Sequence, residues 1–181
     1  QPELRHALES MGKSRISNLT FLNFNNEHVD EETLMKNCIT KIVDGVAELS
    51  KHDVGALIVF ERETQLGEII NTGTIIDAVA SVAMTTSIFF PNSPLHDGAL
   101  IVRDGKLYSA GCILPLTQSR EISSRLGTRH RAGIGMTENS DAVVLIVSEE
   151  TGTISIVMDG QIKRDYNPVS ACAELRRILI D

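Results

Sequence analysis

The seven residues VGALIVF, at positions 54–60, form an almost unbroken apolar run. A strand that is covered on both faces has this composition, because neither of its faces meets water. A second run, AVVLIV at positions 142–147, has the same character. The two runs predict buried strands, and segments with helical periodicity precede and follow them. The sequence therefore predicts an α/β fold in which a mixed β-sheet is flanked by helices.

The other predicted elements lie around these two strands. Residues 99–102 and 107–114 are expected to form a hairpin, because an Asp-Gly pair typical of tight turns separates them. Residues 154–158 are expected to return antiparallel to residues 142–147. Helices are predicted from a cap at Asp30 to about residue 50, over 77–86, over 119–126, after residue 127, and from a cap at Asn167 to the end.

The first 24 residues have a different pattern. Two short helical segments are separated at Gly12 and Lys13, and together they are too small to form a domain. We expect residues 1–27 to be an N-terminal helical hairpin with a regulatory or oligomerisation role. Residues 28–181 are then the main domain.

Composition excludes several classes of protein. The formal net charge of -7 argues against a DNA-binding protein, which would need a basic face. No apolar run approaches the roughly 20 residues of a membrane helix, and the N-terminus lacks the layout of a secretory signal. Cys38, Cys112 and Cys172 are widely spaced among apolar residues, so they are expected to be small core residues. We expect a cytoplasmic protein without a DNA or membrane partner.

Positive charge is concentrated before and within the stretch LGTRHRAGIG at residues 126–135. Thr128 is expected to be the N-cap of a helix, whose free N–H groups and dipole favour phosphate. Guanidinium groups add bidentate contacts to phosphate oxygens. The pattern favours a polyphosphate site, and a solvated basic helix start is the alternative. The arginines of this region are Arg120, Arg125, Arg129 and Arg131.

Polar residues also stand at predicted strand ends. The sequence His96-Asp97-Gly98-Ala99 is either an ordinary Asp-Gly turn or a reactive segment. In the second interpretation, Gly98 lets a substrate approach the backbone, Asp97 accepts a proton from an attacking hydroxyl, and His96 suits a metal or a phosphate.

Ser148-Glu149-Glu150 follows the second buried run. These residues either meet water or hold the divalent ion that accompanies a nucleoside triphosphate. The segment 114–116 (LPL) either ends a strand or forms an apolar wall for a base.

Three motifs in this order, LHDGA at 95–99, GTRHRA at 127–132 and SEETG at 148–152, resemble the diadenylate cyclase domain. The resemblance extends over about residues 31–170. That family joins two ATP molecules into cyclic di-AMP and releases two pyrophosphates. The resemblance implies that residues 28–181 are a diadenylate cyclase catalytic domain, which uses a divalent metal such as Mg or Mn.

The resemblance also implies roles for individual residues. Asp97 matches the catalytic carboxylate that activates the ribose 3'-hydroxyl. His96 and Glu150 match positions associated with the metal, and Leu114 falls where the family's backbone contacts adenine. The other nucleotide-binding positions are Gly98, Ala99, Thr128, Arg129, His130, Arg131 and Ser148.

One departure concerns the helix after residue 127. The usual pattern continues R-H-R-A-A, whereas this chain has Gly133 and, further on, Gly135. Glycine costs a helix interior roughly 1 kcal/mol relative to alanine. Both residues are therefore expected to loosen the helix start and weaken its hold on phosphate.

Among the branches of that family, the chain most resembles the short soluble sporulation-type branch, whose two N-terminal helices restrain activity. A two-fold symmetric product made from two ATP molecules implies a homo-oligomer in which active sites face each other. Three alternatives remain open: a non-catalytic nucleotide sensor, a nucleotidyltransferase with another acceptor, and a structural oligomer whose basic cluster forms salt bridges.

Overall fold

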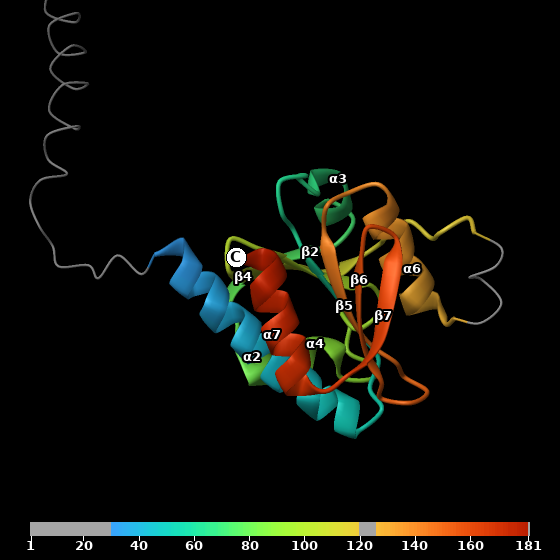
Figure 1. Cartoon of the computed structure of the whole chain (residues 1–181), viewed down its shortest axis with the longest axis horizontal. Coiled ribbons are helices and arrows are strands. Elements are labelled where there is room, and N and C mark those ends of the chain that lie inside the picture. Colours follow the sequence, from blue (N-terminus) through green and yellow to red (C-terminus); the bar gives the residue numbers. More distant parts are fainter. Residues whose placement is uncertain (1–29, 120–125, 181) are drawn as a thin grey trace, which may run out of the picture.

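The computed structural model describes residues 30–119 and 126–180. In these residues, seven strands form one mixed sheet with helices on both faces, which confirms the predicted fold class (Figure 1). The strands are β1 (Ala56–Phe60), β2 (Thr74–Val79), β3 (Ala99–Arg103), β4 (Lys106–Cys112), β5 (Val143–Val147), β6 (Ile154–Met158) and β7 (Gln161–Tyr166). The helices are α2 (Glu31–Lys51), α3 (Gly67–Ile70), α4 (Val82–Phe89), α6 (Thr128–Glu138) and α7 (Pro168–Leu179).

The strand order across the sheet is β2-β4-β3-β1-β5-β6-β7. The β1–β3 pair is parallel, and the other neighbouring pairs are antiparallel. The predicted hairpin of β3 and β4 is confirmed, as is the predicted return of β6 along β5. The two apolar runs form β1 and β5, which are neighbours at the centre of the sheet.

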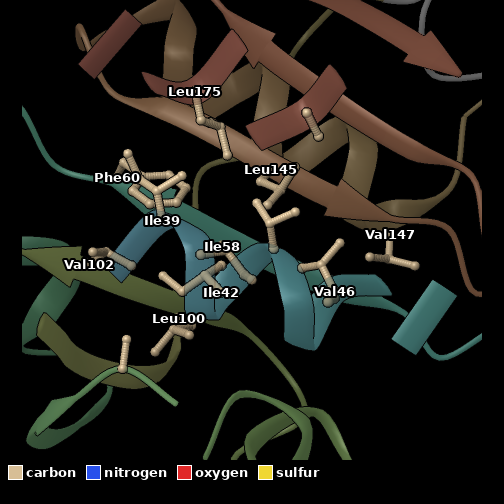
Figure 2. Packing of buried hydrophobic residues seen from close by; sticks show 14 of the residues in the cluster. Ile39, Ile42, Val46, Ile58, Phe60, Leu100, Val102, Leu145, Val147 and Leu175 are labelled. Carbon is tan, nitrogen blue, oxygen red and sulfur yellow. The ribbon is translucent and has the colours of Figure 1, made fainter. Parts of the chain in front are cut away.

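Both faces of β1 and β5 are buried, which explains their unbroken apolar sequences. Successive residues of a strand point to opposite faces, so each central strand contributes to two hydrophobic clusters. On one face, Ile58 and Phe60 pack with Ile42 of α2 and Leu175 of α7 (Figure 2). On the other face, Val59 belongs to a cluster that includes residues of α3 and α6.

Two of the predicted helix starts are confirmed. Asp30 accepts a hydrogen bond from the backbone N–H of Thr33 at 2.6 Å. The last helix begins with Pro168 and has a capping box formed by Asn167 and Ser170. These caps satisfy N–H groups that have no partner within the helix, and so they fix where α2 and α7 begin.

The predicted helix over residues 77–86 is wrong. That stretch contains the end of β2, a break and the first part of α4. Asp77 has a φ of 45°, close to a register shift in the pairing of β2 with β4. Ser81 then caps α4 by accepting from the N–H of Met84 at 3.1 Å. The strand escapes prediction because it lies at the sheet edge and leaves many side chains exposed.

Periodicity does not predict β7 for the same reason, since this strand forms the opposite edge and is mostly exposed. The short helix α3 is not predicted either. The N-terminal hairpin expected in residues 1–27, and almost all of the helix expected over 119–126, lie outside the described residues.

The cysteines behave as expected. Cys38 and Cys112 are buried, Cys172 is partly buried, and all three are free thiols. Burial raises the pKa of Cys38 to about 12, so this thiol stays protonated at neutral pH. Among the helices that the structure describes, none combines the length and the apolar character that crossing a membrane requires.

Candidate functional site

Three strand termini meet at one end of the sheet. The strand β3 begins at Ala99, β1 begins at Ala56, and β5 ends at Val147. In the parallel pair Ile58 is level with Leu100, and in the antiparallel pair Ala56 is level with Val147. The segment before β3 and the segment after β5 are therefore two strand spacings apart, about 10 Å.

The segment before β3 contains the Asp-Gly pair. Gly98 has a φ of 120°, and a Cβ added there would lie 2.6 Å from the carbonyl carbon of Gly111 in β4. Backbone conformation and close packing therefore both require glycine. Asp97 is exposed beside this tight contact, and Ala99 is fully buried. The carboxylate is thus presented at this end of the sheet, whereas Ala99 offers no exposed surface to a ligand.

His96 has a defined ring orientation. Its Nδ1 lies 2.6 Å from the carbonyl oxygen of Ser93. Because a carbonyl oxygen can only accept, Nδ1 must donate, and Nε2 of the neutral ring is left with its lone pair available. A histidine held through one nitrogen by a carbonyl is a common arrangement for a metal ligand.

The helix α6 begins one residue earlier than predicted. Its N-cap is Gly127, with φ -64° and ψ 168°, and Thr128 is the first helical residue. The prediction that Thr128 is the N-cap is therefore wrong. Among residues 30–119 and 126–180, no side chain caps this helix start. Its first N–H groups are available to an anion, and the helix dipole favours negative charge at that point.

The start of α6 forms one wall of a pocket. The second wall is the segment 147–151, at the end of β5 and in the following turn, and Arg164 of β7 completes the lining. The turn is held in place from α2, because the hydroxyl of Ser50 donates to the carbonyl of Gly152 at 2.6 Å. Within the turn, the hydroxyl of Ser148 accepts from the N–H of Glu150 at 3.3 Å. The pocket therefore combines a helix N-terminus with cationic and carboxylate side chains.

His130 lies inside this pocket wall. It is only 6% exposed, and among the described residues its Nε2 has no hydrogen-bond partner. Burial lowers the pKa of His130, and the positive charge of Arg164 lowers it further, whereas Glu150 acts in the opposite direction. The imidazole is consequently biased toward its neutral form in the absence of an anion.

Arg129 lies over the start of the central strand β1, at the end of the sheet where β3 begins and β5 ends. Its guanidinium donates to the carboxylate of Glu149 in an ion pair. The same group lies against Gly55, the residue before β1, since a Cβ added to Gly55 would be 2.8 Å from Nη1 of Arg129. Positive charge thus extends from the α6 start toward the segment that holds Asp97.

Arg131 is separated from the three residues before it. It does not line the pocket, and its carbonyl accepts from the N–H of Thr117 at 3.1 Å. Within the described part of the chain, its buried Nε has no hydrogen-bond partner. Of the expected phosphate-binding residues 128–131, the first three therefore line the pocket and Arg131 does not.

Two glycines of α6 have a packing role that the sequence analysis did not foresee. A Cβ on Gly133 would lie 2.7 Å from Cδ1 of Ile146, and a Cβ on Gly135 would lie 2.3 Å from the carbonyl oxygen of Pro115. Both glycines therefore let α6 approach the sheet and the segment 115–117 closely. The expectation that these glycines loosen the helix start did not take this packing into account.

The segment after β4 is partly apolar surface. Leu114 is 8% exposed and belongs to the hydrophobic cluster beneath α6, so it offers little surface to a base. Ile113 and Leu116 on either side are exposed. The N–H of Ile113 donates to the hydroxyl of Thr72 at 2.9 Å, which holds this segment against the residues before β2.

The predicted site residues do not share one pocket, and Leu114 and Arg131 lie outside its lining. Five of them line one pocket: Thr128, Arg129, His130, Ser148 and Glu150. Asp97 and His96 lie outside that lining, at the start of β3 on the same end of the sheet. The sequence analysis missed Arg164 and Gly55, because no local pattern marks either residue.

The donors present suit a divalent ion that is held partly by its ligand. Among residues 30–119 and 126–180, no three His, Cys, Asp or Glu side chains come together as a metal site. His96 offers an oriented Nε2, and Glu150 offers an exposed carboxylate. The two groups lie on segments two strand spacings apart, so each would supply one ligand at most to an ion such as Mg²⁺, whose other ligands would come from phosphates and water.

Comparison with known proteins identifies the family of this chain. Residues 43–162 match the DAC family, the nucleotide-binding domain of the DisA bacterial checkpoint controller. Cyclic di-AMP synthase CdaA of Bacillus subtilis is 40% identical over 91% of this chain, and cyclic di-AMP synthase CdaS of the same organism is 50% identical over 66% of it. The chain spans 58% of the length of each of these two relatives.

The crystal structure of a double mutant of DacA from Staphylococcus aureus has the same fold. It superimposes with a TM-score of 0.77 at 43% identity, and the match covers 80% of this chain and 96% of that one. The family match covers well over half of the present chain, and the three motifs lie on the matching elements. The chain therefore belongs to the DAC family of DisA-type nucleotide-binding domains.

Proposed function

We propose that residues 28–181 are the catalytic domain of a diadenylate cyclase, which condenses two ATP molecules into cyclic di-AMP and releases two pyrophosphates. One observation carries the proposal. The segment of Asp97 and the uncapped start of α6 lie at the same end of the sheet, with the guanidinium of Arg129 reaching between them. An ATP whose ribose lies at the β3 start extends its phosphates toward α6. The names of the relatives, which are cyclic di-AMP synthases, support the same reaction.

The nucleotide is proposed to bind across this end of the sheet, from the start of β3 to the start of α6. The free N–H groups of residues 128–130 bind the phosphate chain, together with Arg129 and the hydroxyl of Ser148. The backbone at Leu114 meets the adenine, and the exposed Ile113 and Leu116 beside it offer apolar surface. Gly98 is proposed to contact the nucleotide through its backbone, while the absence of its side chain makes room for Gly111 of β4. We assign Arg131 a role in holding the helix start against residues 115–117, rather than a direct phosphate contact.

Chemistry is proposed to occur between two chains. The 3'-hydroxyl of one ATP attacks the α-phosphorus of the ATP in the facing chain, and its proton passes to Asp97. A new P–O bond forms while the bond to pyrophosphate breaks, and the second half of the reaction repeats this with the roles exchanged. A divalent ion, Mg²⁺ or Mn²⁺, bound at His96 and Glu150, would supply charge neutralisation at the phosphates. The positioning of two substrates by two facing chains accounts for much of the expected rate enhancement.

This mechanism requires a symmetric encounter of active faces, so we infer a homo-oligomer in its active form. Residues 1–27 are proposed to control which oligomer forms and thereby to restrain turnover. Removal of residues 1–25 is expected to change both the oligomeric state and the specific activity. If both stayed as in the full chain, this role would be withdrawn.

Product analysis tests the reaction. The full chain is incubated with ATP and Mg²⁺, and separately with ATP and Mn²⁺, and the nucleotides are separated by chromatography. Cyclic di-AMP and pyrophosphate are expected, with a rate per chain that falls on dilution. AMP attached to another acceptor, or a dilute monomer with full activity per chain, would contradict the proposal.

Asp97→Asn is expected to keep the fold and the ATP affinity while abolishing the product. Asp104→Asn is a matched control, because Asp104 is an exposed aspartate just beyond the other end of β3. Its φ of 50° is a conformation that asparagine tolerates well. The control is expected to form product at the normal rate. An Asp97→Asn variant that still cyclised ATP would remove Asp97 from its role.

A further inference from the structure

The side chains of β7 divide between the two faces of the sheet. Ile162 packs against the cluster beneath α6, and Arg164 lines the pocket at the α6 start. Lys163 points the other way, toward α7, where its Nζ lies 3.8 Å from the carboxylate of Glu174. Two neighbouring cations on one strand therefore have different surroundings, and only Arg164 belongs to the nucleotide side.

A local irregularity of β7 accompanies the position of Arg164. In the ladder with β6, Ile154 is paired with Tyr166 and Ile156 with Lys163. Two residues of β7 therefore oppose the single residue Ser155, which is the pattern of a β-bulge. Asp165, next to Arg164, has a φ of 65°. Bulges at sheet edges often redirect a side chain toward a functional site.

The charges around Arg164 leave it available for an anion. Of the two arginines that line the pocket, Arg129 is paired with Glu149. Within residues 30–119 and 126–180, no carboxylate lies within 4.0 Å of the guanidinium of Arg164 to form an ion pair. Its charge is nevertheless felt at His130, whose pKa it lowers. Arg164 is thus an exposed guanidinium beside an uncapped helix start.

The sheet order indicates which part of a nucleotide would reach this group. The strands run β3-β1-β5-β6-β7 across this half of the sheet. If the ribose lies at the β3 start, the phosphate chain extends toward β5 and the α6 start. The phosphates farthest from the ribose then point toward β7.

We propose that Arg164 binds the β- and γ-phosphates of ATP, and therefore the pyrophosphate that leaves. This inference rests on the proposed function, because it takes the direction of the nucleotide from it. Arg164 lies outside the three motifs, so it adds a cation from the sheet edge to those at the helix start. A guanidinium can bind two phosphate oxygens at once, which an ammonium group cannot reproduce.

Binding measurements with four ligands test the assignment: ATP, inorganic pyrophosphate, AMP and cyclic di-AMP. Arg164→Ala is expected to raise the Kd for ATP and for pyrophosphate about tenfold, as loss of a charge-assisted contact does. Its Kd for AMP and cyclic di-AMP should stay unchanged, because neither ligand has β- or γ-phosphates. Arg164→Lys should give an intermediate loss. The melting temperature without ligand should remain that of the wild type, since the side chain is exposed and has no ion-pair partner in the described structure.

Lys163→Ala is the matched control, because it removes the same charge from the neighbouring residue on the opposite face. It is expected to leave all four affinities unchanged. Equal affinities in Arg164→Ala and wild type would overturn the inference while leaving the proposed function in place. An equal loss for AMP and ATP would also overturn it, because the contact would not be with the terminal phosphates. Wild-type protein that bound pyrophosphate through Arg164 but formed no cyclic product would retain the contact and refute the proposed reaction.

Discussion

The guanidinium of Arg129 lies across Gly55, so that a Cβ added to Gly55 would be 2.8 Å from Nη1 and 3.0 Å from Cζ. The contact joins the second residue of α6 to the residue just before β1. Because β1 lies between β3 and β5, the charge of Arg129 is held between the segments of Asp97 and Ser148. Gly55, which has no functional side chain, thus helps to determine where the guanidinium of Arg129 lies.

Gly55→Ala should therefore weaken nucleotide binding with little effect on the fold. The added methyl group would meet the far end of the flexible Arg129 side chain, which can move away, and Cβ of Glu149 at 3.0 Å, which must shift slightly, so the free energy of unfolding should fall by about 1 kcal/mol. The displaced guanidinium should raise the Kd for ATP by about fivefold, as measured by calorimetry. In an Arg129→Ala background the same change should add nothing further. Additive losses in the double variant would show that Gly55 acts by another route.

The ion pair between Arg129 and Glu149 predicts a competition with the ligand. The Glu149 side chain is 65% exposed, so the pair contributes little to stability, within about 1 kcal/mol. The carboxylate of Glu149 binds the guanidinium of Arg129, which we propose to bind phosphate, and it adds negative charge to the pocket. Glu149→Gln should therefore lower the Kd for ATP by roughly threefold at low salt, with a smaller effect at high salt.

A suitable control is Glu68→Gln, which removes the same charge from the exposed surface of α3, away from the pocket lining. It should leave the affinity unchanged. Weaker ATP binding by Glu149→Gln would indicate that Glu149 helps to hold the ligand, and would contradict the competition.

Local chemistry explains which parts of the fold the sequence predicts. The runs 54–60 and 142–147 have no polar positions, so burial on both faces follows from composition alone. The caps Asp30 and Asn167 have side chains that satisfy specific backbone groups, and the turn at 103–106 has Asp104 and Gly105 at positive φ; all three are confirmed. The edge strands β2 and β7 have neither signal, because their form depends on the neighbouring strand.

The same distinction applies to the site. The motifs indicated the residues of the pocket, but not which of them share it. Arg131 lies off the pocket because of its phase on α6, and Arg164 lies on it beside the bulge of β7. The N-cap was misplaced by one residue because Gly127 and Thr128 are both acceptable at that position. These facts depend on packing between segments that are distant in the sequence.

Gly135 should be necessary for stability rather than a weakness of α6. A Cβ at this position would lie 2.3 Å from the carbonyl oxygen of Pro115 and 2.6 Å from the backbone nitrogen of Thr117, and backbone atoms cannot rotate away. Gly135→Ala should therefore destabilise the protein by about 2 kcal/mol, although alanine favours helices. The melting temperature should fall by roughly 5 °C.

Gly67→Ala is the control, because nothing lies within 4 Å of a Cβ there, and it should not destabilise the fold. A Gly135→Ala variant as stable as wild type would mean that α6 can move away from residues 115–117.

His130 should make the free energy of unfolding fall as the pH is lowered through about 6.5. Burial, reinforced by Arg164, lowers its pKa below the ordinary value of 6.5. The unfolded chain then binds a proton at a pH where the folded chain does not. Unfolding is therefore favoured as the pH falls through 6.5, and the stabilisation is fully present above that value.

Denaturant unfolding at several pH values should show this loss of stability, and His130→Gln should reduce it because glutamine does not titrate. Saturating ATP should also reduce the loss, since a phosphate beside the imidazole favours its protonated form. Identical pH profiles for wild type and His130→Gln would show that other groups cause the dependence, and an unchanged profile with ATP would argue that the phosphates lie away from His130.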